Sequence, residues 1–390
     1  MERRDFLAAG ALAAAPLFVP KSAFGANDRI SYGVIATGGR GRYVSSEFAK
    51  LGAECVAVCD VYEPNLEKAK AQHPQAKSFV EYKDLLAEKM DAVLLAGPDH
   101  HHCPMLLAAL EAGKDVYAEK PLSKTLEESI TMINAVRKAS DRVVQIGMQR
   151  RSSEPVLKAK KLIDDGILGQ ITLVKPQWHW NVAKPLDNSP LPGKIDWTRF
   201  LGTAQEREVV PMRFRYWRQF WDYAGGNMTD QGTHLMDVVQ WFTGNSYPAS
   251  AFAQGYVAKN KGAEHADVFS SVFEFPNLLV NWNLDYSNSY ENGWSITFMG
   301  DKGTLILEES GWKIYSEPWK PGAAPAYEEK PTIGVTNVVA HVQNFLDCVK
   351  SRKQPNCSVE MAARAVAGPH LANLSILTRK LATAPAGYMS

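Results

Sequence analysis

A lysine in the first third of the chain has the chemistry needed to act on a bound cofactor and substrate. Lys120 stands between Glu119 and Pro121, directly after a short apolar segment, 115–118, that is predicted to be a strand. If this strand is parallel to its neighbours, Lys120 lies at the carboxyl edge of an open α/β sheet, where ligands bind. A lysine there can take part in proton transfer or stabilise a negatively charged oxygen. The structural alternative is a surface strand end with a salt bridge.

An aspartate and a histidine further along the chain have the types and spacing of an acid/base pair. Asp230 and His234 lie in a segment, 228–242, whose apolar positions repeat with helical periodicity. Because they are four residues apart, a single helix places them on one face. A histidine that titrates near neutral pH, with an acid one turn before it, suits general acid and base catalysis. The alternatives are a surface ion pair or a helix cap, and a lone histidine gives little support for a metal.

A glycine-rich turn near residue 38 is typical of dinucleotide binding. A strand is predicted over 30–36, a helix runs to residue 51, and the next strand ends at Asp60. The glycines let backbone N–H groups approach a pyrophosphate at a helix N-terminus, and the acid accepts hydrogen bonds from the adenosine ribose. A carboxylate would repel a 2′-phosphate, so the sequence predicts NAD and not NADP.

The same turn departs from the usual pattern at one position. Ala36 stands where the first glycine is expected, although alanine disfavours positive φ. The turn residues expected to contact the cofactor are Gly38, Gly39, Arg40 and Gly41.

Alternating strands and helices continue to residue 148, and repeated units of this kind imply a doubly wound parallel sheet. Strands are predicted over 92–96, 115–118 and 143–148, and helices over 83–89, 103–112 and 125–139. Pro98 and His102 follow the strand over 92–96, at the expected ligand-binding edge, and Asp99 is predicted to cap the next helix. Adjacent histidines at 100–102 do not converge on one ion, so no metal is expected.

The pattern changes after residue 151. Strands are predicted over 171–174, 267–275, 278–286, 294–299 and 303–307, and no crossover helix separates the later ones. This indicates a mostly antiparallel sheet with one face left open. The predicted fold is therefore α/β, with an N-terminal Rossmann domain over 28–150, a substrate and oligomerisation domain over 151–330, and C-terminal helices over 331–390 that pack on the body.

Composition and the N-terminus limit the possible partners and location. The chain has 390 residues, which predicts two domains, and its net charge of +1 favours neither nucleic acid nor an anionic membrane. Arg3 and Arg4 precede an apolar run, 7–19, and a cluster of small residues, so residues 1–25 are predicted to be a twin-arginine signal for periplasmic export. The run is too short to span a bilayer. Five cysteines form no disulfide-dense pattern.

In combination, these segments resemble the glucose–fructose oxidoreductase / inositol dehydrogenase (Gfo/Idh/MocA) family. The resemblance covers nearly all of residues 28–310 and rests on the turn at 36–41, Asp60, the run over 112–121, the segment 225–234 and the turn at 300–303. It implies hydride exchange between NAD and a carbinol of a sugar, glycoside or polyol. It also implies tightly bound cofactor in exported members and a homo-oligomer, dimer or tetramer, formed through the open sheet.

The resemblance assigns roles to the three chemical side chains. Lys120 would touch the nicotinamide ribose and the reacting hydroxyl, His234 would take the hydroxyl proton, and Asp230 would orient His234 or hold a neighbouring hydroxyl. Further cofactor contacts are expected from Pro98, His102, Glu119 and Gln149, and further substrate contacts from Arg150, His179, Arg213, Tyr216 and Trp217.

Two other functions fit the same parts. The first is an NAD-dependent glycoside hydrolase similar to the family's α-N-acetylgalactosaminidases, in which a ring hydroxyl is oxidised, the anomeric group is eliminated, water adds and the hydride returns. The second is a non-catalytic sensor of dinucleotide or sugar, which would not need a base and a cation at the nicotinamide. The hydrolase branch tends to lose the lysine of the Glu-Lys-Pro tripeptide, so Lys120 favours a dehydrogenase.

Overall fold

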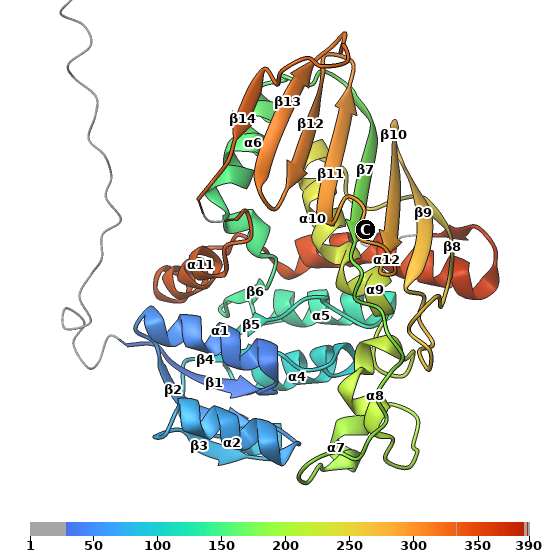
Figure 1. Ribbon diagram of the computed structural model, residues 1–390. Coiled ribbons are helices and arrows are strands. Elements are labelled where there is room, and N and C mark those ends of the chain that lie inside the picture. Colours follow the sequence, from blue (N-terminus) through green and yellow to red (C-terminus); the bar gives the residue numbers. More distant parts are fainter. Residues whose placement is uncertain (1–28, 333, 386–387, 389–390) are drawn as a thin grey trace, which may run out of the picture.

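The first domain is built on a parallel six-stranded sheet, as the sequence predicts. The computed structural model describes residues 29–332, 334–385 and 388, so the predicted signal over 1–25 lies outside the described residues. The strand order is β3-β2-β1-β4-β5-β6, which is the doubly wound order of dinucleotide-binding domains (Figure 1). Its strands are β1 (Ser31–Ile35), β2 (Glu54–Cys59), β3 (Lys77–Phe79), β4 (Ala92–Leu95), β5 (Asp115–Ala118) and β6 (Val144–Ile146).

Helices cover both faces of this sheet, because its central strands are apolar on both sides. Every residue of β4 and β5 is buried. One face packs against α1 and α11, and the other against α3, α4 and α5. The helices are α1 (Gly39–Lys50), α2 (Glu63–Gln72), α3 (Tyr82–Leu86), α4 (Asp99–Glu111), α5 (Leu126–Lys138) and α11 (Val338–Ser351). The strand β3 was not predicted, since three half-exposed residues give no period.

The second domain contains a nine-stranded sheet in the order β14-β13-β12-β11-β7-β10-β9-β8-β15. Only the pair β7 and β10 is parallel among the pairs of this sheet, so the predicted mostly antiparallel sheet is confirmed. The strands are β7 (Ile171–His179), β8 (Ser250–Tyr256), β9 (Val268–Phe275), β10 (Leu278–Asp285), β11 (Gly293–Gly300), β12 (Gly303–Glu308), β13 (Gly311–Ser316), β14 (Tyr327–Glu329) and β15 (Ala382–Thr383).

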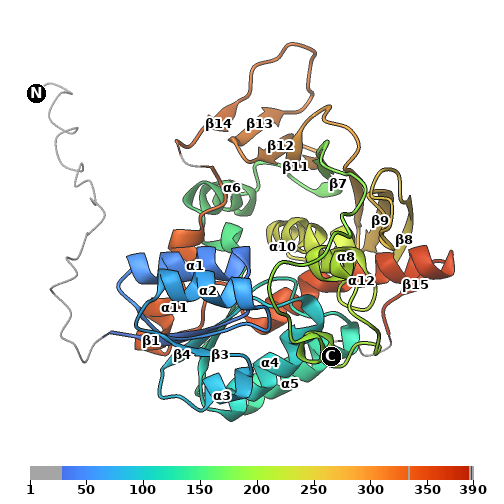
Figure 2. The same ribbon diagram turned by 60° about the horizontal axis from the view of Figure 1, so that its bottom comes forward.

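One face of the large sheet is covered and the other is bare. The helices α6 (Glu154–Asp164), α10 (Gly232–Thr243) and α12 (Val359–Thr378) lie on the covered face (Figure 2). Residues of β9 alternate between buried and exposed, as expected for a strand with one solvated face. The bare face includes the exposed apolar side chains of Phe252, Val272 and Leu279.

A single helix joins the cores of the two domains. The first turns of α12 place Val359, Ala362 and Val366 in the core of the first domain. Two turns later, Leu371 and Ala372 of the same helix belong to the core of the second domain. No helix of the described residues is long and apolar enough to cross a membrane, and the five cysteines of the chain are all free thiols in the structure.

Candidate active site

A cavity of about 460 Å³ opens at the carboxyl edge of the first sheet. The glycine turn, the end of β2 and the beginning of α4 form one wall, which is lined by Gly38, Gly39, Asp60 and Pro98, four of the residues predicted to contact the cofactor. A Cβ atom at Gly38 or Gly39 would meet no atom within 4 Å, so the backbone N–H groups here are open to a ligand. The shape and donors fit the adenosine and pyrophosphate of a dinucleotide.

The local conformation of the turn explains its glycine pattern. A Cβ at Gly41 would lie 2.2 Å from the carbonyl oxygen of Ala36, so only glycine lets α1 pack closely on the turn. Ala36 itself adopts a φ of 67°, in the left-handed region. A non-glycine residue in this region costs roughly 1–2 kcal/mol, so the departure from the usual pattern is tolerated at the cost of backbone strain.

Asp60 is fixed by local hydrogen bonds at the end of β2. Its Oδ2 accepts a hydrogen bond from the backbone N–H of Thr37 (2.7 Å), and its Oδ1 accepts one from the N–H of Tyr62 (2.9 Å). Burial raises the pKa of the Asp60 carboxyl, and these two N–H groups oppose that effect. The carboxylate is therefore held in one orientation at the place where an adenosine ribose would lie.

A long excursion from the second domain closes the other side of the cavity. We call residues 181–224 the cap segment; it contains α7 (Trp197–Leu201), α8 (Pro211–Arg215) and the 3₁₀ helix η4 (Trp217–Gln219), and α7 and α8 lie beside the edge where the strands end (Figure 1). Phe200, Phe214 and Trp217 from this segment line the cavity.

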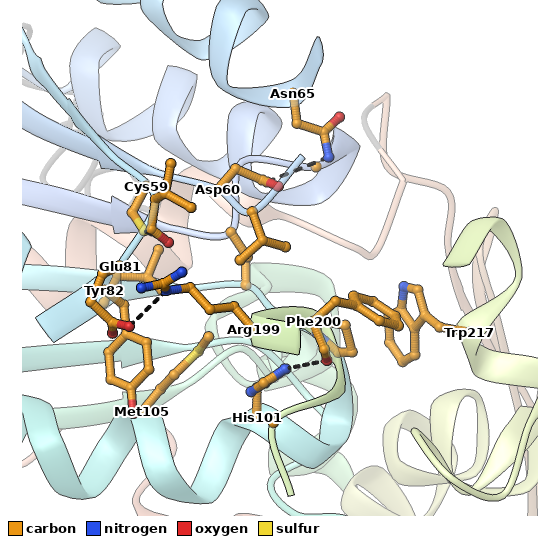
Figure 3. A pocket seen from close by; sticks show the side chains of 18 of the residues that line it. Cys59, Asp60, Asn65, Glu81, Tyr82, His101, Met105, Arg199, Phe200 and Trp217 are labelled. Atoms are coloured by element: carbon orange, nitrogen blue, oxygen red, sulfur yellow. Dashed lines mark hydrogen bonds and ion pairs between the residues drawn. The ribbon is translucent and has the colours of Figure 1, made fainter. Parts of the chain in front are cut away.

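Several contacts tie the cap segment to the first domain. The Nε of Arg199 lies 3.0 Å from Oε2 of Glu81 (Figure 3). The ring nitrogens of His100 and His101 lie 2.9 and 2.8 Å from the carbonyl oxygen of Phe200, and burial lowers the pKa of both imidazoles. Lys194 contributes a further backbone contact, since its carbonyl oxygen accepts from the N–H of Glu63 (2.9 Å). The adenosine end of the site is thus enclosed by two domains.

The Glu-Lys-Pro tripeptide lies beyond the far end of this cavity. Glu119 is buried and pairs with Arg40 of the glycine turn, with Oε1 and Nη2 2.8 Å apart. The ring of His102 lies between the carbonyl oxygens of Pro121 (2.6 Å) and Gly97 (2.8 Å), so it fixes the backbone next to Lys120. Burial lowers the pKa of His102, and the neutral ring donates to one of these two carbonyls.

Lys120 and Asp230 meet across the boundary between the domains. The Nζ of Lys120 donates to Oδ1 of Asp230 at 2.7 Å and to its carbonyl oxygen at 3.0 Å. Arg218 donates to the same Oδ1 through Nε at 3.1 Å. Burial opposes ionisation of Asp230, but Lys120 and Arg218 outweigh it and hold the pKa of this carboxyl below its usual range. Asp230 is therefore an anion shared by two cations.

The prediction of a single helix over 228–242 is wrong in one respect. The structure has two helices, α9 (Gly226–Asp230) and α10, separated at Gln231. The apolar period runs through both helices, so the sequence gave no sign of the break. As a result, Asp230 ends one helix and His234 stands in the first turn of the next.

His234 is brought close to Lys120 by this arrangement. Burial first, and then the positive charges of Lys120 and Arg150, lower the pKa of His234 well below its usual value, and the charge of Asp230 only partly opposes this. The imidazole is therefore neutral at pH 7 and can accept a proton. Among the described residues its ring has no hydrogen-bond partner.

Asp99 differs from its predicted role. Pro98 is the N-cap of α4, and Asp99 is the first residue of the helix. Its carboxyl is buried, its Oδ1 has no hydrogen-bond partner within the described part of the chain, and burial together with the charge of Asp230 raises its pKa to about 7. Asp99 was therefore not identified from the sequence as an acid near the reacting groups, because aspartate so often caps the start of a helix.

The other predicted substrate residues lie in different surroundings. Arg213 pairs with Asp222 (2.8 Å) and Glu264, so its charge is compensated. Tyr216 packs in the core of the cap segment. Gln149, which was predicted to contact the cofactor, is buried in the 3₁₀ helix η3 (Gln149–Ser152), with its Nε2 unpaired in the described structure.

His179 is placed at the end of β7. Its Nδ1 lies 3.2 Å from the carbonyl oxygen of Tyr290, and its side chain lines a separate groove of about 610 Å³.

Arg218, by contrast, was not among the predicted substrate residues, although the arginine and aromatic run over 213–221 was the signal that could have identified it. Whether the predicted residues bind substrate stays a prediction.

Within the described residues, no group of three or more His, Cys, Asp or Glu side chains could hold a metal ion. The groups near Lys120 are the carboxyls of Asp230 and Asp99, the imidazole of His234 and the cation of Arg218, and they do not form a ligand set for a divalent metal.

Comparison with known families agrees with the fold. Residues 30–148 match the model of the oxidoreductase family with an NAD-binding Rossmann fold, and residues 156–306 match the GFO/IDH/MocA C-terminal domain. The chain belongs to the Gfo/Idh/MocA family, and its first domain is an NAD-binding Rossmann domain.

Curated relatives match about a third of the chain. Inositol 2-dehydrogenase of Salmonella paratyphi B is 34% identical over 134 residues, which are 34% of this chain and 40% of that protein. Inositol 2-dehydrogenase/D-chiro-inositol 3-dehydrogenase of Halalkalibacterium halodurans is 37% identical over 153 residues, covering 37% of this chain and 43% of that protein. The matched region therefore spans only about two fifths of these relatives.

Solved structures extend the similarity of fold to nearly the whole chain. A complex of levoglucosan dehydrogenase with NADH and levoglucosan has a TM-score of 0.74 at 18% identity, covering 92% of this chain and 100% of that one. The WlbA dehydrogenase from Bordetella pertussis, in complex with NADH and UDP-GlcNAcA, has a TM-score of 0.70 at 21% identity, covering 92% and 99%. At these identities the likeness establishes the fold.

Proposed function

We propose that this protein is an NAD-dependent oxidoreductase that transfers hydride between a carbinol of a sugar, glycoside or polyol and tightly bound NAD. The observation that carries the proposal is the meeting of Lys120, Asp230 and His234 at the carboxyl edge of an NAD-binding domain. The names of the relatives, which are inositol and sugar dehydrogenases, support the same substrate class.

The residues that would hold NAD come from both domains. Gly38 and Gly39 would offer backbone N–H groups to the pyrophosphate, Asp60 would accept hydrogen bonds from the adenosine ribose, and Phe200 and Trp217 of the cap segment line the cavity. When bound, the nicotinamide supplies the chemistry of accepting or returning a hydride.

The protein's own residues handle the proton and the charge on oxygen. The neutral imidazole of His234 accepts the proton of the substrate hydroxyl as its carbon is oxidised. The ammonium of Lys120 stabilises the negative charge that develops on that oxygen. Asp230 holds Nζ of Lys120 in place through its carboxylate and its carbonyl oxygen, so the cation is oriented before substrate arrives.

The cap segment supports tight binding of the cofactor. Ion pairing of Arg199 with Glu81 and the two histidine contacts to Phe200 would have to break before the adenosine could leave freely. We expect slow exchange with free NAD, which suits an exported enzyme. Export through the predicted twin-arginine signal over 1–25 belongs to the same proposal.

The bare face of the nine-stranded sheet supports a homo-oligomer. Phe252, Val272 and Leu279 expose 40%, 40% and 50% of their surface on neighbouring strands, and such a patch favours association. We propose that a second copy covers this face, and sedimentation of the wild type and a Leu279→Lys variant would test it.

One experiment tests the enzymatic proposal. The full chain is purified, part of the preparation is denatured to release and identify bound dinucleotide, and the native enzyme is offered polyols, free sugars and aryl glycosides. We expect NAD in the released fraction and reduction of bound NAD by a polyol or sugar. Release of aglycone without net NADH formation would establish the glycosidase alternative instead, which no contact in the described structure favours at present.

A further inference from the structure

Arg150 is a buried arginine with unpaired hydrogen-bond donors. It lies in η3, directly after the last strand of the first sheet, and is only 4% exposed. Its Nε and Nη1 have no hydrogen-bond partner in the described structure. Burying such donors without acceptors is unfavourable, so this arrangement needs an explanation.

Two indole rings hold the guanidinium in place. Its carbon lies 3.7 Å from the ring centroid of Trp294 and 5.7 Å from that of Trp178. Glu309 accepts a hydrogen bond from Nε1 of Trp294 (3.0 Å). Burial lowers the pKa of Arg150 to about 10, although the charges of Glu309 and Asp237 oppose this effect. Nε1 of Trp178 is a further buried donor without an acceptor. The cluster therefore holds buried donors that no acceptor among the described residues satisfies.

The cluster belongs to the substrate side of the active site. The charge of Arg150 contributes to lowering the pKa of His234, together with that of Lys120. Lys120 and Arg218 both contact one carboxylate, Asp230. Asp237 pairs with Arg151, and Glu309 and Asp237 act on Arg150 through their charge without an ion pair to it. Nε and Nη1 of Arg150 therefore stay unpaired in the described structure, beside the reacting groups.

We propose that the substrate is an acidic sugar, a uronic or aldonic acid, whose carboxylate is bound by Arg150 and Nε1 of Trp178 while its carbinol lies between Lys120 and His234. This inference rests on the proposed function and narrows its substrate class. A carboxylate supplies charged acceptors for the unpaired donors of Arg150 and Trp178. A neutral hydroxyl is a weaker acceptor for a guanidinium than a carboxylate.

Matched substrate pairs test the proposal. Each pair differs only in a carboxylate against a hydroxymethyl group: glucuronate and glucose, galacturonate and galactose, gluconate and glucitol. The NAD-loaded full chain is assayed for NADH formation, and binding is measured separately by isothermal titration calorimetry. Because a charge-assisted hydrogen bond discriminates by roughly 10- to 100-fold, we expect the acidic member of at least one pair to be preferred by that factor. The preference should weaken as the salt concentration rises.

Variants of Arg150 test whether this side chain causes the preference for acidic sugars. Arg150→Met keeps an unbranched side chain between the indoles but removes the charge, so it should abolish the preference, whereas Arg150→Lys should retain part of it. Arg364→Met, which removes an exposed arginine on α12, is the matched control and should behave as the wild type. Thermal unfolding of each variant identifies any that fails to fold.

The outcomes separate the two proposals. If the neutral sugars are oxidised and the acidic sugars are preferred neither in rate nor in binding, this inference is overturned and the proposed dehydrogenase activity stands. Stronger binding of acids that depends on Arg150, without NADH formation from any pair, supports this inference and counts against the dehydrogenase. An acid preference that survives in Arg150→Met also overturns the inference, because the charge would then act elsewhere.

Discussion

Asp230→Asn removes the anion that two cations share and keeps the size of the side chain. The side chains of Lys120 and Asp230 are only 13% and 12% exposed, and their charged atoms lie 2.7 Å apart. Two unit charges about 4 Å apart attract by about 4 kcal/mol near a protein surface, and removal of one member of a buried pair typically costs about 3–5 kcal/mol. Since the unfolding entropy of a chain of this length is roughly 0.8 kcal/mol per degree, we expect the variant to unfold roughly 4–6 °C below the wild type.

The same substitution should reduce catalysis for two reasons. Nζ of Lys120 loses the acceptor that positions it, and His234 loses the negative charge that opposes the lowering of its pKa. A displaced catalytic group and a weaker base together predict a fall in kcat/KM of about 100-fold or more. Oxidation of the preferred polyol, followed as NADH formation across a range of pH, measures this effect.

Asp237→Asn is the matched control. Asp237 pairs with Arg151 at 2.8 Å, is equally buried and lies on α10, but it does not contact Lys120. It should lose stability to a similar extent while its kcat falls far less. Equal losses of kcat in the two variants, or an Asp230→Asn enzyme that turns over within about twofold of the wild type, would refute the role given to Asp230.

Three further predictions follow from the site. His234→Ala should lower kcat by roughly 10²- to 10⁴-fold. Because the pKa of His234 is lowered, polyol oxidation by the wild type should persist below the ordinary histidine pKa of about 6.5. A wild-type rate that halves near pH 7 would contradict this expectation. Asp99 is protonated in the folded state up to a pH of about 7 but ionises near 4 when unfolded, so it reduces stability as pH rises between these values, and Asp99→Asn should flatten that decline in thermal unfolding. Gly41→Ala should cost about 1–3 kcal/mol because its Cβ would meet the Ala36 carbonyl, whereas Gly39→Ala, with open space around it, should unfold near the wild-type temperature.

The sequence predicted the parts that depend on local patterns. The glycine turn and Asp60 lie in one cavity, because a strand, a tight turn and a helix leave the chain few alternatives. The order of strands in the nine-stranded sheet was beyond reach, since β7 pairs with β10 and β11 from over 100 residues away. Such long-range pairing depends on which faces pack together and leaves no period in the sequence.

Electrostatic details of the site were also beyond sequence reasoning. Asp230 and His234 were predicted to share the face of one helix, but the helix is interrupted at Gln231. The carboxylate of Asp230 contacts Lys120 and Arg218. The pKa of Asp99 depends on burial and on Asp230, which comes from the other domain. The sequence of one segment does not show which residues of another domain will pack against it.

The helix α12 has a consequence for how the enzyme can move. Its two halves are built into different cores, and Gly368 and Pro369 stand between them. Helices bend at such a position, because proline lacks the backbone N–H and its ring crowds the preceding turn. A change in the angle between the domains would therefore bend α12 at Pro369, and it would alter the distance between Lys120 and Asp230 across the domain boundary.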